Sequence, residues 1–366
     1  MTTVYIIRHA EAEGNLYRRI HGWYDSLLTG QGMKQVEALR KRFEGIQIDA
    51  VYSSDKKRTI ATAQALLADR DIELQVTPML REMGMGKWED GTWGDFQKYD
   101  TQQYDYFNKD PDKYCVEGSE SHAYVQKRIV ETVLDLAKKH DGETIAIFSH
   151  GAAIRAFQAY FLGIPSERIT EVEHGDNTAV TKALIDGDKV EFCYLSDGSH
   201  IAEMSRMARQ LWWKTGGAVD NRAMRYVEAD LEKDRETYLD CRREEYEFNN
   251  GCLDGFCESC ADRAAERKTY WAIKDEKIAG LVELDTEKGA SEGVGYIDYY
   301  CMLPQYRGQT LAVQLLGQAV SVYRAMGRTK LRLDVPAKNE HAIGFFEHFG
   351  FKRLTNDKTI TMEKDI

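Results

Sequence analysis

The sequence contains no apolar run that approaches the ~18 residues of a membrane-spanning helix. It has only five prolines among 366 residues, so no proline-rich linker divides it, and it holds no glycine/serine-rich tract, internal repeat or low-complexity segment. The N-terminal run Met1 to Ile7 is too short for a signal peptide and lacks a basic lead, so it predicts a strand. We therefore expect a folded protein with no membrane partner.

Basic clusters and a disulfide framework are also missing. The net charge is −11, and no dense block of lysine and arginine offsets it. Because an acidic chain repels a polyphosphate backbone, we expect no nucleic-acid partner. The seven cysteines are odd in number and scattered, which does not predict disulfide bonds in a chain of this size. The expected compartment is the cytoplasm.

The length, by contrast, is ample for two domains with separate cores. In the first half, short apolar runs alternate with segments of helical spacing. The expected strands are 4–7, 49–52, 144–148, 178–184 and 189–194, and the expected helices are 30–44, 58–67 and 125–140. This alternation predicts an α/β fold, with a mostly parallel sheet between two layers of helices.

The pattern changes after about residue 200. Residues 222–247 are highly charged and predict one or two exposed helices. A smaller mixed α/β domain is then expected, with strands at 269–273, 278–284, 295–303 and 331–335 and helices at 310–326 and 340–349. We place the boundary at about residues 198–215, which gives domains of 1–200 and 205–366.

Arginine and histidine residues follow the predicted strands of the first domain. Arg8-His9 follows the first strand, Ser149-His150-Gly151 follows a later one, and Arg58 opens the helix after the second. In an open α/β sheet, ligands bind beyond the carboxyl ends of the strands. An arginine fork matches phosphate oxygens, and neutral imidazole can attack phosphorus. Taken singly, these residues are ordinary surface and turn residues, but together they predict a phosphate site.

These residues are part of a longer series of motifs that resembles one family. The series runs through Arg8-His9-Ala10-Glu11-Ala12 with Asn15, Asp25 to Gly32, Tyr52 to Asp55 with Arg58-Thr59 and Thr62-Ala63, Leu80-Arg81-Glu82 with Gly86, Trp88 and Glu89, and Phe148 to Gly151. Over most of residues 1–195 it resembles the histidine phosphatase, or phosphoglycerate-mutase-like, superfamily. Ala10 and Ala12 stand where that family usually has glycine and threonine. Both are small, so we expect altered neighbouring contacts and retained chemistry.

The resemblance implies a role for each motif residue. His9 is expected to be the nucleophile that forms a phosphohistidine. The groups expected to bind the phosphoryl oxygens are Arg8, Asn15, Arg58 and His150, and His150 also belongs to the catalytic set. Glu82 is expected to protonate the leaving oxygen and then to activate water. The first domain is thus expected to hydrolyse a small phosphorylated metabolite, without a metal or other cofactor.

A phosphomutase is the alternative for the same site. The run His21-Gly22-Trp23-Tyr24-Asp25 resembles the mutase branch of the family. However, Glu82 is followed directly by Gly86-Lys87-Trp88-Glu89, which resembles the phosphatase branch, because sugar-phosphate mutases carry a longer insertion there. This analogy favours hydrolysis. The aromatic and acidic stretch 88–121 is expected either to cap the pocket and select the substrate or to pack its own small core.

The second domain carries its own motif, between a strand and a long helix. The run is Met302-Leu303-Pro304-Gln305-Tyr306-Arg307-Gly308-Gln309-Thr310-Leu311-Ala312. Such a turn exposes backbone N–H groups that can cradle a pyrophosphate. Together with the later residues Pro336, Asn339, Ala342 and 345–351, the run resembles GNAT-type N-acetyltransferases from Tyr270 onward.

That second resemblance implies acetyl-CoA and an amine acceptor. The residues expected to hold the cofactor are Met302, Leu303, Arg307, Gly308, Gln309, Thr310, Leu311, Ala312 and Asn339. Thr310 stands where the family has glycine, and Phe346 stands where it usually has a tyrosine that protonates the leaving thiolate. Two functions therefore stay open for this domain, an N-acetyltransferase or a module that binds acetyl-CoA without catalysis.

Three cysteines have a spacing that can also hold an iron–sulfur cluster if a fourth joins them. They are Cys252, Cys257 and Cys260, in a C-x4-C-x2-C pattern. A spacing of three also places Cys257 and Cys260 on one helix face, and free cysteine is commonly buried. We therefore expect a structural role and no metal site.

Overall fold

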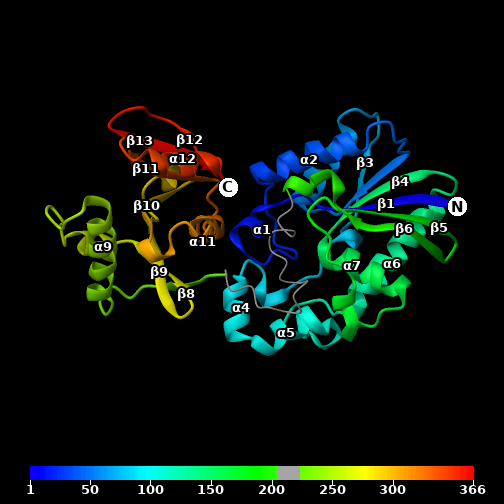
Figure 1. The fold of residues 1–366 in the computed structure, drawn as a ribbon, viewed down its shortest axis with the longest axis horizontal. Helices are drawn as coiled ribbons and strands as arrows, with labels where there is room; N and C mark the ends of the chain where they lie inside the picture. Colours follow the sequence, from blue (N-terminus) through cyan, green and yellow to red (C-terminus); the bar gives the residue numbers. More distant parts are fainter. Residues whose placement is uncertain (205–222) are drawn as a thin grey trace. The chain divides into compact units, whose positions relative to one another are not determined.

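The computed structural model describes residues 1–204 and 223–366. It divides into two compact units, which hold most of residues 1–204 and most of residues 223–366 respectively. The predicted domain boundary at residues 198–215 lies largely outside the described residues. Figure 1 traces the elements of each unit along the chain.

A six-stranded sheet forms the centre of the first unit. In chain order its strands are β1 (Thr2–Arg8), β2 (Ala50–Ser53), β3 (Leu74–Val76), β4 (Thr144–Ser149), β5 (Val180–Asp186) and β6 (Lys189–Asp197). Their spatial order is β3-β2-β4-β1-β5-β6, with the first four parallel and the last two antiparallel. The central strands are buried almost throughout, as strands covered by helices on both faces must be.

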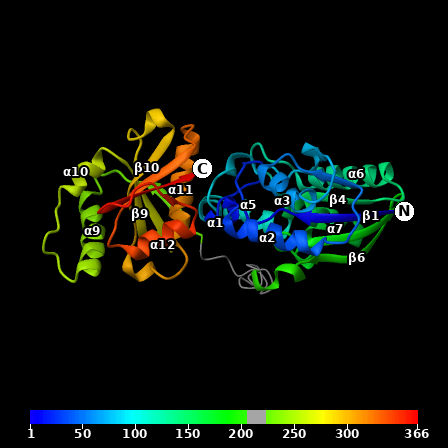
Figure 2. The same ribbon diagram turned by 90° about the horizontal axis from the view of Figure 1, so that it is seen from above.

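Helices cover both faces of this sheet, so the predicted three-layer α/β/α fold is confirmed. On one face, α2 (Gly30–Arg42) and α3 (Lys57–Leu67) pack against alternate β1 residues such as Tyr5 and Ile7. On the other lie α6 (His122–Lys139) and α7 (Gly151–Leu162), as Figure 1 shows from the side and Figure 2 from above. The short helix α1 (Glu13–Tyr17) follows β1. The helix ends follow local chemistry, since Thr29 accepts a hydrogen bond from the Gly32 amide at the start of α2.

The aromatic stretch before α6 folds into α4 (Trp93–Tyr99) and α5 (Thr101–Lys109). The Phe96 ring is fully buried and lies 4.8 Å from Trp88 and 5.6 Å from Tyr104, centroid to centroid. Tyr114 is also buried and lies 5.5 Å from Phe107. These rings therefore pack a small core of their own, which was the alternative to substrate selection.

The second unit is built on a seven-stranded mixed sheet. In chain order its strands are β7 (Arg225–Glu228), β8 (Lys268–Lys274), β9 (Lys277–Asp285), β10 (Val294–Met302), β11 (Lys330–Pro336), β12 (Lys352–Arg353) and β13 (Thr359–Asp365). The spatial order is β12-β13-β11-β10-β9-β8-β7, and only β10 and β11 are parallel neighbours. This is the mixed α/β domain that the sequence predicts.

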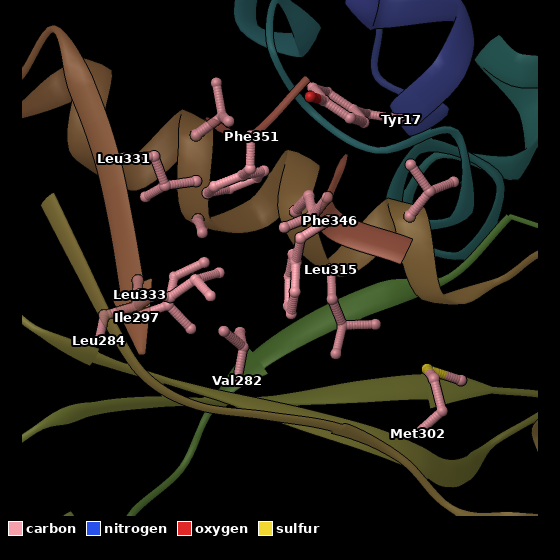
Figure 3. Close-up of a cluster of buried hydrophobic side chains, with 14 of the residues drawn as sticks. Tyr17, Val282, Leu284, Ile297, Met302, Leu315, Leu331, Leu333, Phe346 and Phe351 are labelled. Atoms are coloured by element: carbon pink, nitrogen blue, oxygen red, sulfur yellow. The ribbon is translucent and has the colours of Figure 1, made fainter. Parts of the chain in front are cut away.

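Helices cover both faces of the second sheet as well. On one face, α9 (Arg235–Asn250) and α10 (Cys260–Ala265) bury Tyr238 and Cys260 against Leu281 of β9. On the other, α11 (Ala312–Ala325) and α12 (Glu340–His348) bury Leu315 and Phe346 against the sheet, within the core drawn in Figure 3. The core is thus split into two apolar layers by the sheet.

One expectation for this unit is wrong in part. Residues 222–247 were expected to form one or two exposed helices, but 225–228 form the edge strand β7, which pairs with β8. Residue 222 lies outside the described residues, and only α9, from residue 235, is helical. The high charge misleads because an edge strand faces solvent along one side, and charged residues are common there.

Candidate active site

Three neighbouring strands deliver the candidate catalytic residues to one edge of the first sheet. In the register, Arg8 at the end of β1 pairs with Ser149 at the end of β4, and Ser53 of β2 lies beside β4 as well. The residue that follows each strand therefore reaches the same place. His9 and His150 meet there, with ring centroids 5.2 Å apart. The expected convergence of these two side chains is present.

The His9 ring is held in one tautomer by the main chain. Its Nδ1 lies 2.8 Å from the carbonyl oxygen of Ala10, and because a carbonyl only accepts, Nδ1 carries the proton. The lone pair is then on Nε2. The ring is almost fully buried, and this burial, followed by the charges of Arg58 and Arg8, holds the pKa of His9 well below its ordinary value. His9 is therefore a neutral imidazole with a nucleophilic Nε2 at neutral pH.

Arg58 is fully buried in a cradle of backbone carbonyls. Its Nη2 donates to the oxygens of His21 and Gly22, both at 2.8 Å, and its Nη1 donates to the oxygen of Tyr24 at 3.0 Å. Burial lowers its pKa to about 10, so it stays charged at neutral pH. Its Nε is buried without a hydrogen-bond partner among the described residues. This loop of carbonyls, residues 21–24, fixes the cation beside His9.

Arg8 is the second cation of the site. Its Nη1 donates to the carbonyl oxygen of Gly175 at 2.6 Å and lies 3.3 Å from Nδ1 of His174. Its Nε, like that of Arg58, is buried and has no acceptor in the described part of the chain. An unsatisfied buried donor is unfavourable. An oxyanion could satisfy both guanidinium groups.

Both ring nitrogens of His150 already have protein partners. Arginine can only donate, so Nδ1 accepts from Nη2 of Arg58 at 3.1 Å, and Nε2 then donates to Oγ of Ser54 at 2.9 Å. Burial first, and then Arg58, hold the pKa of His150 well below its ordinary value. A phosphoryl oxygen that binds His150 would have to replace one of these two partners.

Glu82 sits at the N-terminus of α7. Its carboxylate accepts hydrogen bonds from the amides of Ala152 and Ala153, both at 3.0 Å, and from that of Met83 at 2.9 Å. Backbone N–H groups at the start of the helix thus hold both side-chain oxygens of Glu82 in place. Glu82 also interacts electrostatically with Arg8 and Arg58, which places it at the same site.

Asn15 reaches the site through a third histidine that the sequence-based prediction did not include. Its Nδ2 donates to Nε2 of His21 at 3.2 Å, and Nδ1 of His21 in turn lies 3.1 Å from Oγ of Ser26. The ring of His21 is 5.6 Å from that of His9. Asn177 donates to the carbonyl oxygen of His9 at 3.0 Å. The site residues that the sequence-based prediction missed are thus His21, Ser54, His174 and Asn177. Of these, His21 and Ser54 stood within recognised motifs.

In the second unit, the candidate cofactor turn has an unusual backbone. Gly308 has a φ of 73° and Thr310 a φ of 59°, so a β-branched residue adopts the left-handed conformation at the family's glycine position. The amides of Gly308, Gln309, Thr310 and Leu311 have no acceptor among the residues that the structure describes. They precede the fourteen-residue helix α11. Free amides before a helix fit a pyrophosphate.

The side chain of Arg307 faces helix α9. Its Nε donates to the carbonyl oxygen of Met302 at 2.9 Å, and its Nη1 donates to Oδ1 of Asn249 at 3.0 Å. The guanidinium also lies 4.7 Å from the centroid of the Phe248 ring. Arg307 therefore anchors the turn to α9, and the backbone amides of residues 308–311 stay available to bind a ligand.

Strands β10 and β11 separate beside this turn. They pair only from Val294 to Ile297, so the second half of β10, which ends at Met302, has no neighbour on that side among the described residues. Met302 is buried, and so is the next residue, Leu303. Asn339 caps α12, because its Oδ1 accepts from the amide of Ala342 at 3.1 Å. The backbone of β10 beyond Ile297 is therefore not paired with β11, and such a strand edge can bind an extended ligand.

Phe346 belongs to the core of the second unit. It is 5% exposed, and its ring centroid lies 5.3 Å from that of Phe351 and 5.5 Å from that of Tyr300. Figure 3 shows it beside Leu315 in the cluster of buried side chains. The hydroxyl group of Tyr300 donates to the carbonyl oxygen of Ala312. No proton donor occupies the position of Phe346 itself.

The cysteine triplet does not gather around one point. Cys252 and Cys257 are exposed, whereas Cys260 is buried in the core with Cys241. Residues 1–204 and 223–366 contain no group of three His, Cys, Asp or Glu side chains placed to hold a metal ion. Within the same residues, no helix has the length and apolar character that a membrane crossing requires.

The first unit is an α/β fold that brings two buried histidines and two arginines, each with an unpaired buried Nε among the described residues, to one edge of its sheet. The family model of the histidine phosphatase superfamily (branch 1) matches residues 4–197, and the chain belongs to this superfamily. The model of the acetyltransferase (GNAT) family matches residues 222–351. The chain is thus a fusion of two domains, as the sequence motifs predict.

Individual relatives cover the first domain. Phosphoglycerate mutase-like protein 4 of Arabidopsis thaliana is 32% identical over 204 residues, which are 55% of this chain and 87% of that protein. Phosphoserine phosphatase 1 of Hydrogenobacter thermophilus is 27% identical over 164 residues, 45% of this chain and 78% of that protein. The solved structure of Bacillus stearothermophilus YhfR is 32% identical with a TM-score of 0.53, and the match covers 55% of this chain and all of that one.

Proposed function

We propose that residues 1–200 form a phosphomonoesterase that acts through a phosphohistidine at His9. The observation that carries the proposal is the state of the His9 ring. Its protonated Nδ1 donates a hydrogen bond to the carbonyl oxygen of Ala10, and its Nε2 carries no proton at neutral pH. Beside it, Arg8 and Arg58 each hold one buried N–H without a partner in the described chain. A nucleophile between two cations suits a phosphate dianion.

The first step is attack of His9 Nε2 on phosphorus. The Nε2–P bond forms, and the bond from phosphorus to the leaving oxygen breaks. Arg8 and Arg58 stabilise the charge that spreads over the other phosphoryl oxygens. Protonated Glu82 gives its proton to the leaving oxygen, so the organic product departs as an alcohol.

The second step releases phosphate. The Glu82 carboxylate takes a proton from water, and the water oxygen attacks phosphorus. The P–Nε2 bond breaks, the electron pair returns to the imidazole, and inorganic phosphate leaves. His9 regains its starting tautomer because Nδ1 stays bonded to the Ala10 carbonyl throughout.

A screen of small phosphomonoesters tests this assignment, with His9→Ala as the control. Phosphoserine is a sensible first substrate, because one relative is named a phosphoserine phosphatase. We expect release of inorganic phosphate from the wild type, an acid-labile phosphoenzyme in rapid quench, and neither from His9→Ala. Transfer of phosphate between positions of a sugar acid, with no inorganic phosphate released, would instead identify a phosphomutase.

For residues 205–366 we propose an acetyl-CoA-dependent N-acetyltransferase. Supporting this, the free amides of Gly308 to Leu311 suit the pyrophosphate, and the gap between β10 and β11 beside Met302 suits the pantetheine arm. The cofactor supplies an activated acetyl group for an amine. Because Phe346 holds no proton, catalysis would have to do without an acid at that position.

Calorimetry with acetyl-CoA and a CoA-release assay with a panel of amines test the second activity together. An acetyltransferase binds acetyl-CoA and releases CoA only when an acceptor amine is present. Binding without release from any amine would instead identify an acetyl-CoA-sensing module. Absence of binding would remove both assignments.

A further inference from the structure

A second carboxylate, Glu89, lies behind the cradle of Arg58. It follows the short turn η2 (Gly86–Trp88) and is half-buried. Its Oε1 accepts from the amides of Trp23 at 2.7 Å and Met85 at 2.9 Å, and its Oε2 accepts from the amide of Tyr24 at 2.7 Å. Three backbone donors converge on one carboxylate, and two of them come from the loop that holds Arg58.

The same peptide groups connect Glu89 with Arg58. The peptide unit between Gly22 and Trp23 donates its N–H to Glu89 and accepts from Nη2 of Arg58 through its carbonyl. An anion on one end and a cation on the other polarise this peptide and strengthen both hydrogen bonds. Glu89 also attracts the Arg58 guanidinium electrostatically. The carboxylate therefore acts on the cation through a single rigid group.

Glu89 also ties the Arg58 loop to the segment that carries Glu82. A Cβ placed on Gly22 would lie 2.3 Å from the carbonyl oxygen of Met83 and 2.6 Å from Oε1 of Glu89, so the two segments touch through a glycine. Met85, which also donates to Glu89, belongs to the same segment as Glu82. One carboxylate thus sets the spacing between the phosphate-binding cation and the candidate acid.

The turn that carries Glu89 is itself held at both ends. The amide of Lys87 donates to the carbonyl oxygen of Glu117 at 3.0 Å, and the amide of Ile20 donates to that of Gly91 at 2.8 Å. Gly86 has a φ of 58°, and a Cβ there would lie 2.1 Å from the Glu117 oxygen. Glu89 therefore lies on a rigid turn, and a residue can hold other groups in position only if its own backbone is fixed.

We propose that Glu89 is a positioning residue that orients Arg58 for the phosphoryl group and holds Glu82 at its working distance. The proposal rests on the proposed phosphatase function. Glu89 is assigned no contact with substrate. It acts through the 21–24 loop, and its removal lowers oxyanion affinity and catalysis together.

A double-mutant cycle with Arg58 tests the coupling. Glu89→Gln keeps the shape of the side chain but removes its charge and one acceptor oxygen. We expect kcat/KM for p-nitrophenyl phosphate to fall about 10- to 100-fold and the Kd for inorganic phosphate, measured by calorimetry, to rise about tenfold. In an Arg58→Ala background the same change should cost less than about twofold, because the group it acts through is gone. Glu117→Gln, an exposed carboxylate in a neighbouring turn, should leave both constants unchanged.

Additive losses in the cycle would overturn the proposal, since they mean that Glu89 acts independently of Arg58. So would a Glu89→Gln variant with wild-type phosphate affinity. If the wild type binds phosphate but hydrolyses no ester, the phosphatase assignment fails, and the cycle is read from phosphate Kd alone. If it neither binds phosphate nor hydrolyses esters, both assignments are overturned.

Discussion

Replacing Gly22 by alanine should disable the phosphate site without removing any of its functional side chains. The added Cβ would lie 2.3 Å from the carbonyl oxygen of Met83, whereas ordinary contact begins at 3.4 Å. The atoms that the new Cβ would meet are the backbone oxygen of Met83 and the carboxylate of Glu89, and neither can rotate away freely. The 21–24 loop must therefore shift by about 1 Å, and Arg58 moves with the carbonyls that hold it.

A displacement of this size lowers kcat/KM by about 100-fold, or about 2.7 kcal/mol in the barrier. Steady-state hydrolysis of p-nitrophenyl phosphate measures it, with circular dichroism to verify that the variant is folded. Gly30→Ala is the matched control. It makes the same chemical change at the first residue of α2, where a Cβ meets nothing within 4 Å. Equal kcat/KM in the two variants would refute the argument that close approach at Gly22 fixes Arg58.

Three further results are expected. Burial, and then the charge of Arg58, hold the pKa values of His9 and His150 well below 6.5, so the unfolded chain takes up protons that the folded chain does not. Stability is therefore full above pH 6.5 and falls below it by about 1.4 kcal/mol per pH unit for each histidine. Urea unfolding across that range should show a shallower dependence for His150→Asn, and an unchanged slope would contradict the assignment. Thr310→Gly should stabilise the second unit by about 1 kcal/mol in thermal unfolding. A non-glycine residue in the left-handed conformation is strained by about 1–2 kcal/mol, and the larger conformational entropy of glycine in the unfolded chain offsets part of the relief. A destabilised variant would contradict the strain. Arg307→Ala should weaken acetyl-CoA binding about tenfold in calorimetry, because ordering the released turn costs about 1 kcal/mol. Lys277→Ala, at an exposed position where β9 begins, serves as its control.

The residues that the first sheet brings to one edge could be predicted from the sequence. His9, Arg58 and His150 each follow a strand, and parallel neighbouring strands end at one edge, so their meeting could be predicted without coordinates. The structure adds the partners that no periodicity encodes. Arg58 is held by three carbonyls of an irregular loop. His21 to Asp25 stands in a recognised motif, but the motif does not say that its backbone carbonyls bind Arg58.

Charge was the less dependable guide in the second unit. The run after residue 222 is rich in charge, yet its first described part forms β7, because an edge strand can be as polar as an exposed helix. The departure at Thr310 was visible in the sequence, but its left-handed backbone was not, since a threonine there predicts ordinary φ values. In both places, at β7 and at Thr310, the backbone conformation is set by tertiary packing, which local sequence propensity does not predict.

The proton on His9 is assigned by a main-chain oxygen, and this has a consequence for how the site can change over generations. Every amino acid at position 10 supplies the same carbonyl, so no codon change there can switch which imidazole nitrogen of His9 carries the proton. Selection at that position is left to act on size alone, since residue 10 is fully enclosed and its amide donates to Thr62. Alanine at position 10, where the family usually has glycine, therefore leaves the His9 tautomer as glycine would, because the carbonyl that sets it is common to both residues.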